Sequence, residues 1–465
     1  MAGKRESIIK LRSITLEDFK SVDYGKIDIS PNEEGGADIL GIYGQNGSGK
    51  TALIEAMAIV KHLMSGAAVP NVYSDCVSSA SGVSRVSLTY QIEHEDEIAY
   101  ADYSFRMSRV EENEVDRVNY SGLFLGGDVK TASDGYKLDI YDEKLTLKEG
   151  ENAESLVLRD VSEGRNVFNL DGAFTYMDLS KEVIIDFEVN KRLIREKSAS
   201  FLFSNYLTEK AEGTVKLNWV LNSMREYARN DFFVVDTKST GYVQLNYSLP
   251  IYTRNGVYFF KSYEPTFIAD DLFEYMSGQI DGISEVLGQL VPGLGIGINV
   301  AATTTDSTGV SGKRVELVSL RDGIQLPLRY ESDGVRKIIS ELAYIIAVYN
   351  EEGFTVAVDE FDSGVFEFLL GEVLETLADS GRGQLIFTSH NLRPLEVVNS
   401  SYICFTTTDP KNRYIKIVPE EGENFRAGYF RKIMLDTGVQ KMYSRTKKHK
   451  IMAALSHAGG DERDD

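Results

Sequence analysis

Alternating and continuous apolar runs divide the first part of the chain into short strands and one helix. Strand-type residues predict β-strands over Ile8–Thr15 and Gly25–Ile29, and the apolar run Ala37–Tyr43 predicts a third. Ala52–Met64 follows after a glycine-rich loop, and its apolar residues recur at helical spacing: Leu53, Met57 and Val60.

The middle of the chain changes from strand-like to helix-like patterns. Apolar and polar residues alternate from about Ser84 to Asp186, which predicts antiparallel strands. Lys191–Asn230 is mostly helical in pattern, and Asp231–Lys261 is again strand-like. Asp270–Leu290 predicts an amphipathic helix whose apolar face contains Leu272, Met276, Ile280, Ile283 and Leu287.

Composition and charge narrow the class of protein. Apolar residues make up 42% and charged residues 26% of the chain, as in ordinary globular proteins. The net charge of −21 should make the average surface repel nucleic acid, although a local basic groove stays open as an alternative. The two cysteines, Cys76 and Cys404, predict neither a disulfide framework nor a zinc cluster.

We expect a cytoplasmic protein that does not cross a membrane. The N-terminal residues lack the apolar core of a signal peptide, and no apolar run approaches the roughly 18 residues of a membrane span. The five histidines form no close pair with metal-ligand spacing, which argues against HNH-type nuclease and metalloprotease centres.

A phosphate-binding loop occupies Gly44–Thr51, which reads GQNGSGKT between a predicted strand and a predicted helix. Glycines let backbone N–H groups turn toward phosphates, and the helix N-terminus adds positive charge. Lys50 should reach the β- and γ-phosphates of ATP, and the Thr51 hydroxyl should hold Mg²⁺. The alternative is a chance glycine-rich turn. The candidate nucleotide-binding residues of the loop are Gly44, Asn46, Gly47, Ser48, Gly49, Lys50 and Thr51.

An acidic pair follows a second buried strand. Phe354–Val358 is a continuous apolar run, as expected for a strand covered on both faces, and Asp359 and Glu360 come directly after it. Asp359 would complete the Mg²⁺ shell, and Glu360 would orient and deprotonate the attacking water. The alternative is a strand that ends in a solvated acidic turn.

A third apolar strand, Gln384–Thr388, delivers Ser389 and His390 at its end. A histidine at this position can form a hydrogen bond with the γ-phosphate. The alternative is a capping or core histidine.

Together these motifs resemble the RecF/SMC/OLD-like branch of ABC-type ATPases. The opening IIKLRSITLEDFKSVDYGKIDI is similar to the first strands of that branch, with Phe19 and Lys20 as its aromatic–basic pair. VAVDEFDSG and FTSHN supply the acidic strand, a D-loop-like stretch at Phe361–Gly364 and the switch histidine. The resemblance covers about residues 1–65 and 315–420. It implies an α/β fold, specifically a P-loop ABC-type ATPase head with a large mixed β/α insertion.

Ser332–Val335 resembles a degenerate form of the family's signature motif at the start of a helix. In such ATPases two heads face each other, and the signature serine of one contacts the γ-phosphate held by the other. Ser332 and Gly334 are therefore candidate nucleotide contacts, with a simple helix cap as the alternative. For the Q-loop, Gln91 is a weak candidate.

The resemblance divides the chain into an N-terminal head lobe at 1–65, an insertion at 66–314, a C-terminal head lobe at 315–440 and a basic-then-acidic tail at 441–465. The insertion is expected to be antiparallel β and then mostly helical, and is a candidate region for dimerisation or partner binding. Lys50 and Asp359 lie 359 − 50 = 309 residues apart, so the insertion is long, yet it shows no coiled-coil arm. This arrangement resembles the ATPase subunits of the PARIS, AbiL and Septu anti-phage systems.

Three functions follow from these expectations. The first is an ATP-hydrolysing, Mg²⁺-dependent sensor or scaffold of an anti-phage system. It would form homodimers or higher oligomers through its heads, respond to a phage-encoded trigger, and control a separate effector such as a Toprim-like nuclease. The second is a RecF/SMC-like repair ATPase that clamps DNA, which the acidity disfavours. The third, a transporter head, is disfavoured by the insertion. The basic segment Lys441–Lys450 is either a contact for nucleic acid or an acidic partner, or a solvated helix end.

Overall fold

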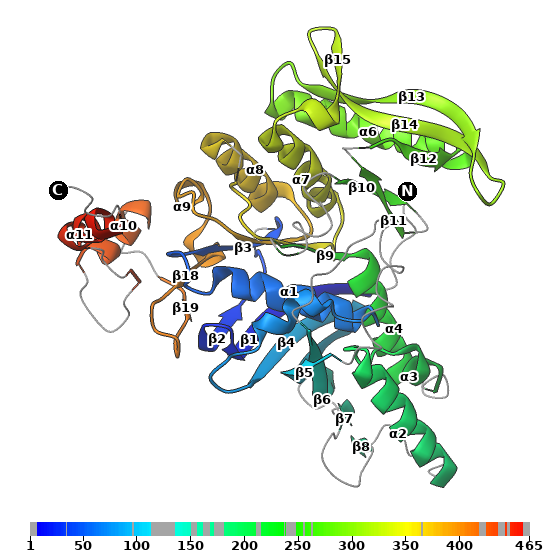
Figure 1. Cartoon of the computed structure of the whole chain (residues 1–465), viewed down its shortest axis with the longest axis vertical. Helices are drawn as coiled ribbons and strands as arrows, with labels where there is room; N and C mark the ends of the chain where they lie inside the picture. Colours follow the sequence, from blue (N-terminus) through cyan, green and yellow to red (C-terminus); the bar gives the residue numbers. More distant parts are fainter. Residues whose placement is uncertain are drawn as a thin grey trace, which may run out of the picture.

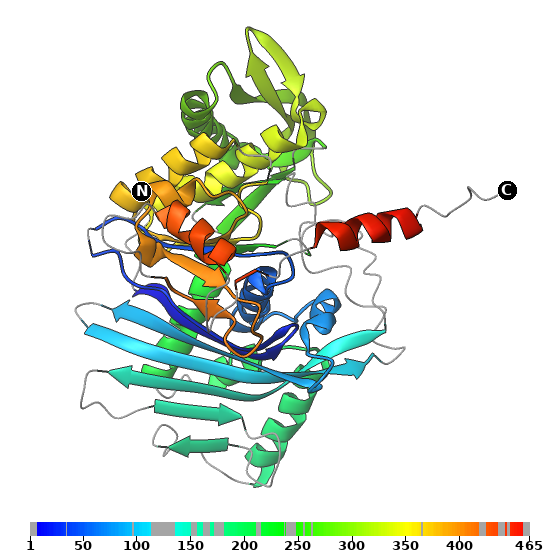
Figure 2. The same ribbon diagram turned by 90° about the vertical axis from the view of Figure 1, so that its left-hand side faces the viewer.

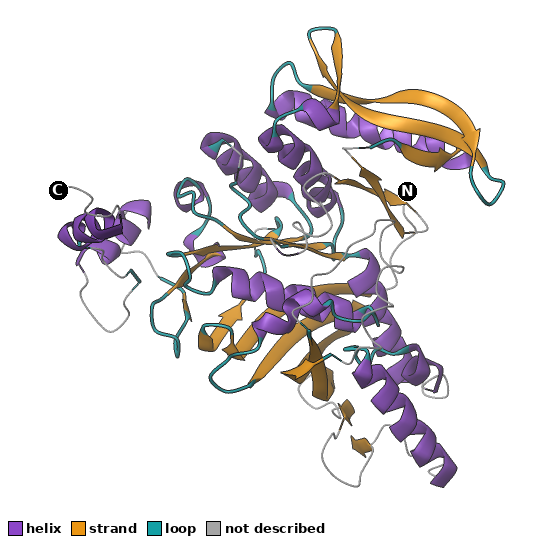
Figure 3. Cartoon of the chain, in the orientation of Figure 1, coloured by secondary structure: helices purple, strands orange, loops and turns teal. Residues whose placement is uncertain are grey.

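The computed structural model describes most of the chain as four β-sheets with helices packed between and around them (Figures 1 and 3). The described residues are 7–33, 35–94, 97–112, 135–149, 156–160, 168–171, 181–210, 215–236, 238, 248–253, 256–261, 264–363, 366–417, 425–435, 442–443 and 447–458. Within these ranges, no helix is both long and apolar enough to cross a membrane.

A six-stranded sheet forms the centre of the nucleotide-binding half. Its strand order is β19-β18-β3-β17-β16-β9, and all neighbours are parallel except β18 and β19. Every residue of β3, β16, β17 and β18 is buried, because helices or a second sheet cover both faces, and this explains their unbroken apolar sequences. The strands span Asp38–Tyr43 (β3), Phe232–Val235 (β9), Thr355–Val358 (β16), Gln384–Thr388 (β17), Ile403–Thr406 (β18) and Tyr414–Ile415 (β19).

A seven-stranded antiparallel sheet lies beneath it, in the order β2-β1-β4-β5-β6-β7-β8 (Figure 2). Burial alternates along β4, so one face of this sheet packs on the core and the other faces outward. The strands span Ser7–Phe19 (β1), Val22–Asp28 (β2), Val83–His94 (β4), Glu97–Glu111 (β5), Tyr136–Glu149 (β6), Leu156–Asp160 (β7) and Phe168–Asp171 (β8).

Helix α1, Lys50–Met64, runs between these two sheets (Figure 1). Most of its residues are buried, because it contributes to the core formed with β1, β4 and β5 while also packing against β9 and the central strands. Helix α4, Val215–Asn230, packs against α1 and β9. The 3₁₀ helix η1, Asn71–Cys76, also packs against α1. Helices α2, Lys181–Glu196, and α3, Asn205–Lys210, lie beside the large sheet. The helix that follows the phosphate loop is thus held on two sides.

Helices α7 and α8 cover the other face of the central sheet (Figure 1). They span Asp333–Asn350 and Glu367–Ser380, and the short α9, Pro394–Val397, packs on α8. Two further helices follow the last strand, α10 at Phe425–Leu435 and α11 at Lys448–Ala458. Figure 2 shows α11 projecting from the body of the molecule.

A smaller lobe rests on α7. Helix α6 has the predicted bounds, Asp270–Leu290, and buries four of the five predicted apolar positions, while Leu272 is only partly buried. It packs on a sheet of β12, β14 and β13, with β15 paired to β14. The strands span Ser248–Thr253 (β10) and Gly256–Lys261 (β11) in a neighbouring hairpin, then Thr266–Ala269 (β12), Gly295–Thr305 (β13), Ser311–Arg321 (β14) and Ile324–Pro327 (β15).

The strand pairings cross the predicted lobe boundaries. Strands β4 to β6 lie after residue 65 but extend the sheet that β1 begins, and β9 joins the central sheet beside β16. The second boundary, at residues 314 and 315, falls inside β14. The sequence did not indicate these pairings, because pairing between distant strands leaves no trace in local periodicity. Helix α2 also differs from the prediction, because it begins at Lys181, ten residues before the predicted helical stretch. In the predicted tail, residues 441, 444–446 and 459–465 lie outside the described part of the chain.

Candidate functional site

The glycine-rich loop joins β3 to α1 with backbone angles that only glycine adopts readily. Gly44 has φ of +156°, and Gly49 caps α1 at φ of +91°. A Cβ on Gly44 would lie 1.7 Å from Thr406 Oγ1, so no side chain fits there. The loop hydroxyl of Ser48 is buried and bonds to Gln45 O at 2.6 Å, while Asn46 and Gly47 are exposed at the tip. In this geometry the backbone amides of the loop and the N-terminus of α1 face the same space, where a phosphate would bind.

Lys50 lies at the first position of α1 and curls back into the loop. Its Nζ donates to the carbonyl oxygens of Gly44, at 2.8 Å, and Gln45, at 3.1 Å. Burial lowers the pKa of Lys50, and nearby carboxylates, Asp359 first among them, oppose that shift. The ammonium group is therefore held inside the loop, within reach of an anion bound there.

The acidic pair stands at the carboxyl end of β16, beside the loop. Thr51 Oγ1 donates to Asp359 Oδ1 across 3.4 Å, and Thr388 Oγ1 donates to the same oxygen at 2.6 Å. The other oxygen, Asp359 Oδ2, is buried and has no hydrogen-bond partner among the described residues. Burial raises the pKa of Asp359, and the hydrogen bonds from Thr388 and Thr51 oppose it. A buried carboxylate oxygen without a partner, next to a threonine hydroxyl, suits a hard cation such as Mg²⁺.

Glu360 has a left-handed backbone and an exposed side chain. Its φ is +53°, which is costly for a residue with a Cβ, and its N–H donates to Thr388 Oγ1 at 2.8 Å. The single hydroxyl of Thr388 therefore binds both acidic residues.

Asp362 connects the D-loop-like stretch to the predicted switch histidine. Its Oδ2 accepts hydrogen bonds from the backbone N–H of His390, at 3.0 Å, and of Asn391, at 2.9 Å. The His390 side chain is exposed, which rules out a core histidine. Gly364, the last residue of the predicted stretch, lies outside the described residues.

The predicted signature begins α7, as expected. Ser332 is the N-cap residue, and its Oγ accepts the N–H of Val335 at 3.3 Å, so it does cap the helix. Ser332 is also exposed and Gly334 is half-buried, so both could meet another molecule. Gln91 is held elsewhere, on β4, where Arg12 Nε donates to its side-chain oxygen at 2.7 Å.

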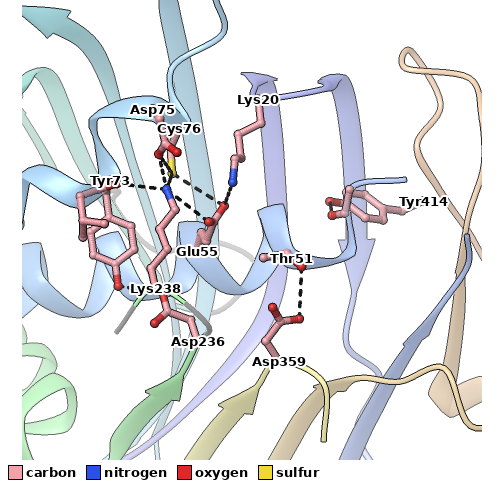
Figure 4. Close-up of polar contacts among 12 residues, drawn as sticks. Lys20, Thr51, Glu55, Tyr73, Asp75, Cys76, Asp236, Lys238, Asp359 and Tyr414 are labelled. Carbon is pink, nitrogen blue, oxygen red and sulfur yellow. Dashed lines mark hydrogen bonds and ion pairs between the residues drawn. The ribbon is translucent and has the colours of Figure 1, made fainter. Parts of the chain in front are cut away.

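Sequence reasoning missed a buried polar cluster on α1, one turn after Thr51. Glu55 is buried between two lysines, Lys20 Nζ at 2.5 Å and Lys238 Nζ at 3.3 Å (Figure 4). Lys238 also pairs with Asp75. These ion pairs join α1 to the β1–β2 turn, η1 and the end of β9.

Asp236 is a second missed residue, and a signal for it existed. It follows β9, the neighbour of β16, in the sequence FFVVD, which repeats the apolar-run-then-acid pattern of TVAVDE. Asp236 is buried and accepts a hydrogen bond from the Tyr73 hydroxyl at 2.7 Å.

A further missed contact is that of Tyr414, whose hydroxyl donates to Gly49 O at 2.7 Å and fixes the end of the loop. Local patterns could not reveal this contact, because Tyr414 lies on the distant strand β19.

Comparison with solved structures finds SMC and RecF heads. An SMC head bound to the C-terminal winged-helix domain of ScpA matches with a TM-score of 0.42 and 13% identity, over 89% of this chain and 99% of the other. The SMC head domain from Thermotoga maritima gives 0.34 and 13%, over 88% and 100%. The recombination mediator RecF gives 0.36 and 10%, over 89% and 100%. No curated protein matches.

Two family models match the sequence. An AAA domain model matches residues 13–62, which include the phosphate loop. A second model, described as "AAA domain, putative AbiEii toxin, Type IV TA system", matches residues 39–396 and so spans both the loop and the acidic pair. With the parallel central sheet and the loop described above, these AAA-domain matches confirm the predicted α/β P-loop ATPase fold. Because the second match covers most of the chain, the protein belongs to the AAA-domain family of the putative AbiEii toxin, type IV TA system.

Proposed function

We propose that the protein binds ATP with Mg²⁺ at this site and hydrolyses it to ADP and phosphate. The observation that carries the proposal is that Thr51 Oγ1 lies 3.4 Å from Asp359 Oδ1, while Asp359 Oδ2 is buried and has no hydrogen-bond partner in the described part of the chain. A threonine hydroxyl and an aspartate oxygen would hold Mg²⁺, which neutralises charge on the phosphates. Lys50 lies beside them in the loop.

The residues have separable roles in this mechanism. Lys50 would exchange the carbonyl oxygens of Gly44 and Gln45 for the β- and γ-phosphates, with the loop amides around them. Glu360 would take a proton from the attacking water while the water oxygen bonds to the γ-phosphorus. The bond to the β–γ bridging oxygen breaks, and ADP leaves. His390 would donate a hydrogen bond to the γ-phosphate.

The same proposal includes a second copy of the chain. Ser332 is exposed at the start of α7, where its hydroxyl and the helix N-terminus would contact a γ-phosphate bound by the other head. Two aromatic side chains are largely exposed close in sequence to Ser332 and to the D-loop-like stretch Phe361–Gly364. They are Tyr330, at 65%, and Phe366, at 69%. Exposed aromatic residues are common anchors of protein interfaces, which supports head-to-head dimers or higher oligomers.

In the cell, the protein would act as the sensor or scaffold of an anti-phage system and control a separate effector, such as a Toprim-like nuclease. The support is the family description, which names a putative toxin of a TA system. ATP can drive such control only if it binds two conformations with different affinity, and closure of two heads around the γ-phosphate would supply that difference.

Phosphate release from purified protein tests the enzymatic part of the proposal. We expect release with ATP and Mg²⁺, loss of release with EDTA, and recovery when Mg²⁺ is restored. Absence of release at protein concentrations that give dimers would contradict hydrolysis.

The cellular role needs a separate test. The chain is expressed alone and with its neighbouring gene, and the cells are challenged with phage. The pure protein is also incubated with DNA and RNA in Mg²⁺ or Mn²⁺. We expect protection only with the co-encoded protein, and no nuclease activity. Protection by the single gene, or cleavage that survives Glu360→Gln, would contradict a separate effector.

A further inference from the structure

A lysine of α7 reaches the backbone of the acidic pair. Lys337 Nζ donates to the carbonyl oxygen of Glu360 at 2.6 Å and lies 3.5 Å from Glu341 Oε1. Its side chain is only 14% exposed, so this position is enclosed rather than a chance surface contact. The helix that Ser332 caps is therefore tied directly to the residue proposed to activate water.

The backbone of Glu360 requires such support. A left-handed conformation is unfavourable for a residue with a Cβ and persists only where surrounding contacts fix it. The N–H of Glu360 is held by Thr388, and its carbonyl oxygen accepts from Lys337 and from Ser363 N, at 2.9 Å. Of these contacts, only that of Lys337 carries a charge and comes from the helical layer.

Glu341 holds Lys337 from the other side. It lies one helical turn further along α7 and lines a mostly apolar cavity with residues such as Leu290, Phe361 and Leu370. Burial raises the pKa of Glu341 to about 8, and Lys337 is the group that most opposes this rise. The ammonium group at the end of the long, flexible lysine side chain thus has a contact on each side, with the Glu360 carbonyl oxygen and with Glu341.

We propose that Lys337 is a positioning residue for Glu360. Its ammonium group holds the Glu360 carbonyl, fixes the left-handed backbone and so aims the carboxylate at the attacking water, while Glu341 keeps Lys337 in place. Because Ser332 caps α7 and Lys337 lies on it, a shift of that helix on contact with a second head would reach Glu360 in the same chain. The inference rests on the role proposed for Glu360.

The test compares steady-state ATP turnover of Lys337→Met with that of the wild type. A misaimed catalytic group can cost up to about 100-fold in rate, so we expect kcat to fall at least about 10-fold while KM and ATP affinity stay within about threefold. Lys337→Arg retains a charged donor and should recover part of the loss. Lys148→Met is the matched control, because Lys148 is 57% exposed in a surface ion pair with Asp102, and it should leave turnover unchanged.

A double variant separates positioning from folding. In a Glu360→Gln background, Lys337→Met should change the residual rate by less than about twofold, because no carboxylate is left to aim. Equal losses in both backgrounds, or a kcat of Lys337→Met within twofold of the wild type, would overturn the inference. If Lys337→Met does not fold, Lys337→Gln gives the same comparison. If Glu360→Gln alone turns over normally, the proposed function itself fails.

Discussion

Replacing Thr388 with valine removes the hydroxyl that joins the two acidic residues. Thr388 is buried, donates to Asp359 Oδ1 at 2.6 Å and accepts from Glu360 N at 2.8 Å. Valine has nearly the same shape, so Thr388→Val deletes both hydrogen bonds without opening a large cavity.

The size of the effect follows from these two bonds. A hydrogen bond to a charged group contributes about 1.5–3 kcal/mol, and a neutral one about 1 kcal/mol, so the unfolding free energy should fall by about 2.5–4 kcal/mol. The Thr388 hydroxyl also lowers the pKa of Asp359 against the effect of burial. Without it the pKa rises further, and more Mg²⁺ or a higher pH is needed to obtain the charged form. Displacement of Glu360 should lower kcat at least about 10-fold.

The assay is phosphate release as a function of Mg²⁺ concentration, with urea unfolding in parallel. Thr388→Ser is the control, because it keeps the hydroxyl and should restore most of the turnover and the Mg²⁺ response. A Thr388→Val protein whose kcat and half-saturating Mg²⁺ both stay within twofold of the wild type would refute this reasoning.

Three further substitutions test other parts of the account. Lys50→Ala should weaken ATP binding in calorimetry by more than about threefold, roughly 0.6 kcal/mol, and a smaller loss would mean that the loop does not hold the phosphates. Ser332→Arg and Lys50→Ala should each abolish turnover, and mixing them should restore part of it, because a mixed pair keeps one intact shared site; no recovery in any mixture would argue against shared sites. Burial lowers the pKa of His62 to about 4, so its contribution to stability is present above about pH 6.5 and is lost as the pH falls toward 4. His62→Gln should therefore flatten the fall of the unfolding free energy over that range, and an unchanged slope would contradict this assignment.

The parts of the site that could be predicted from sequence are those formed by motifs of consecutive residues. GQNGSGKT and the apolar run before Asp359 have local signals, because a phosphate loop and a doubly buried strand each need a particular residue order. The bounds of α6 were predicted for the same reason, from its helical repeat.

The parts that were missed depend on contacts between distant segments. The pairing of β4 with β1 and the place of β9 beside β16 are set by tertiary packing, so the prediction of an insertion at residues 66–314 did not include these pairings. The contacts of Thr388 with Glu360 and of Lys337 with the Glu360 carbonyl involve ordinary residues, which the sequence does not mark as functional.

Single-turnover hydrolysis by Glu360→Gln tests the central claim most directly. The variant is loaded with ATP and Mg²⁺, and bound nucleotide, phosphate and particle mass are measured over time. We predict ATP affinity close to that of the wild type, hydrolysis at least about 100-fold slower, and accumulation of ATP-bound dimers. Hydrolysis at the wild-type rate would contradict the account and would place the catalytic base elsewhere.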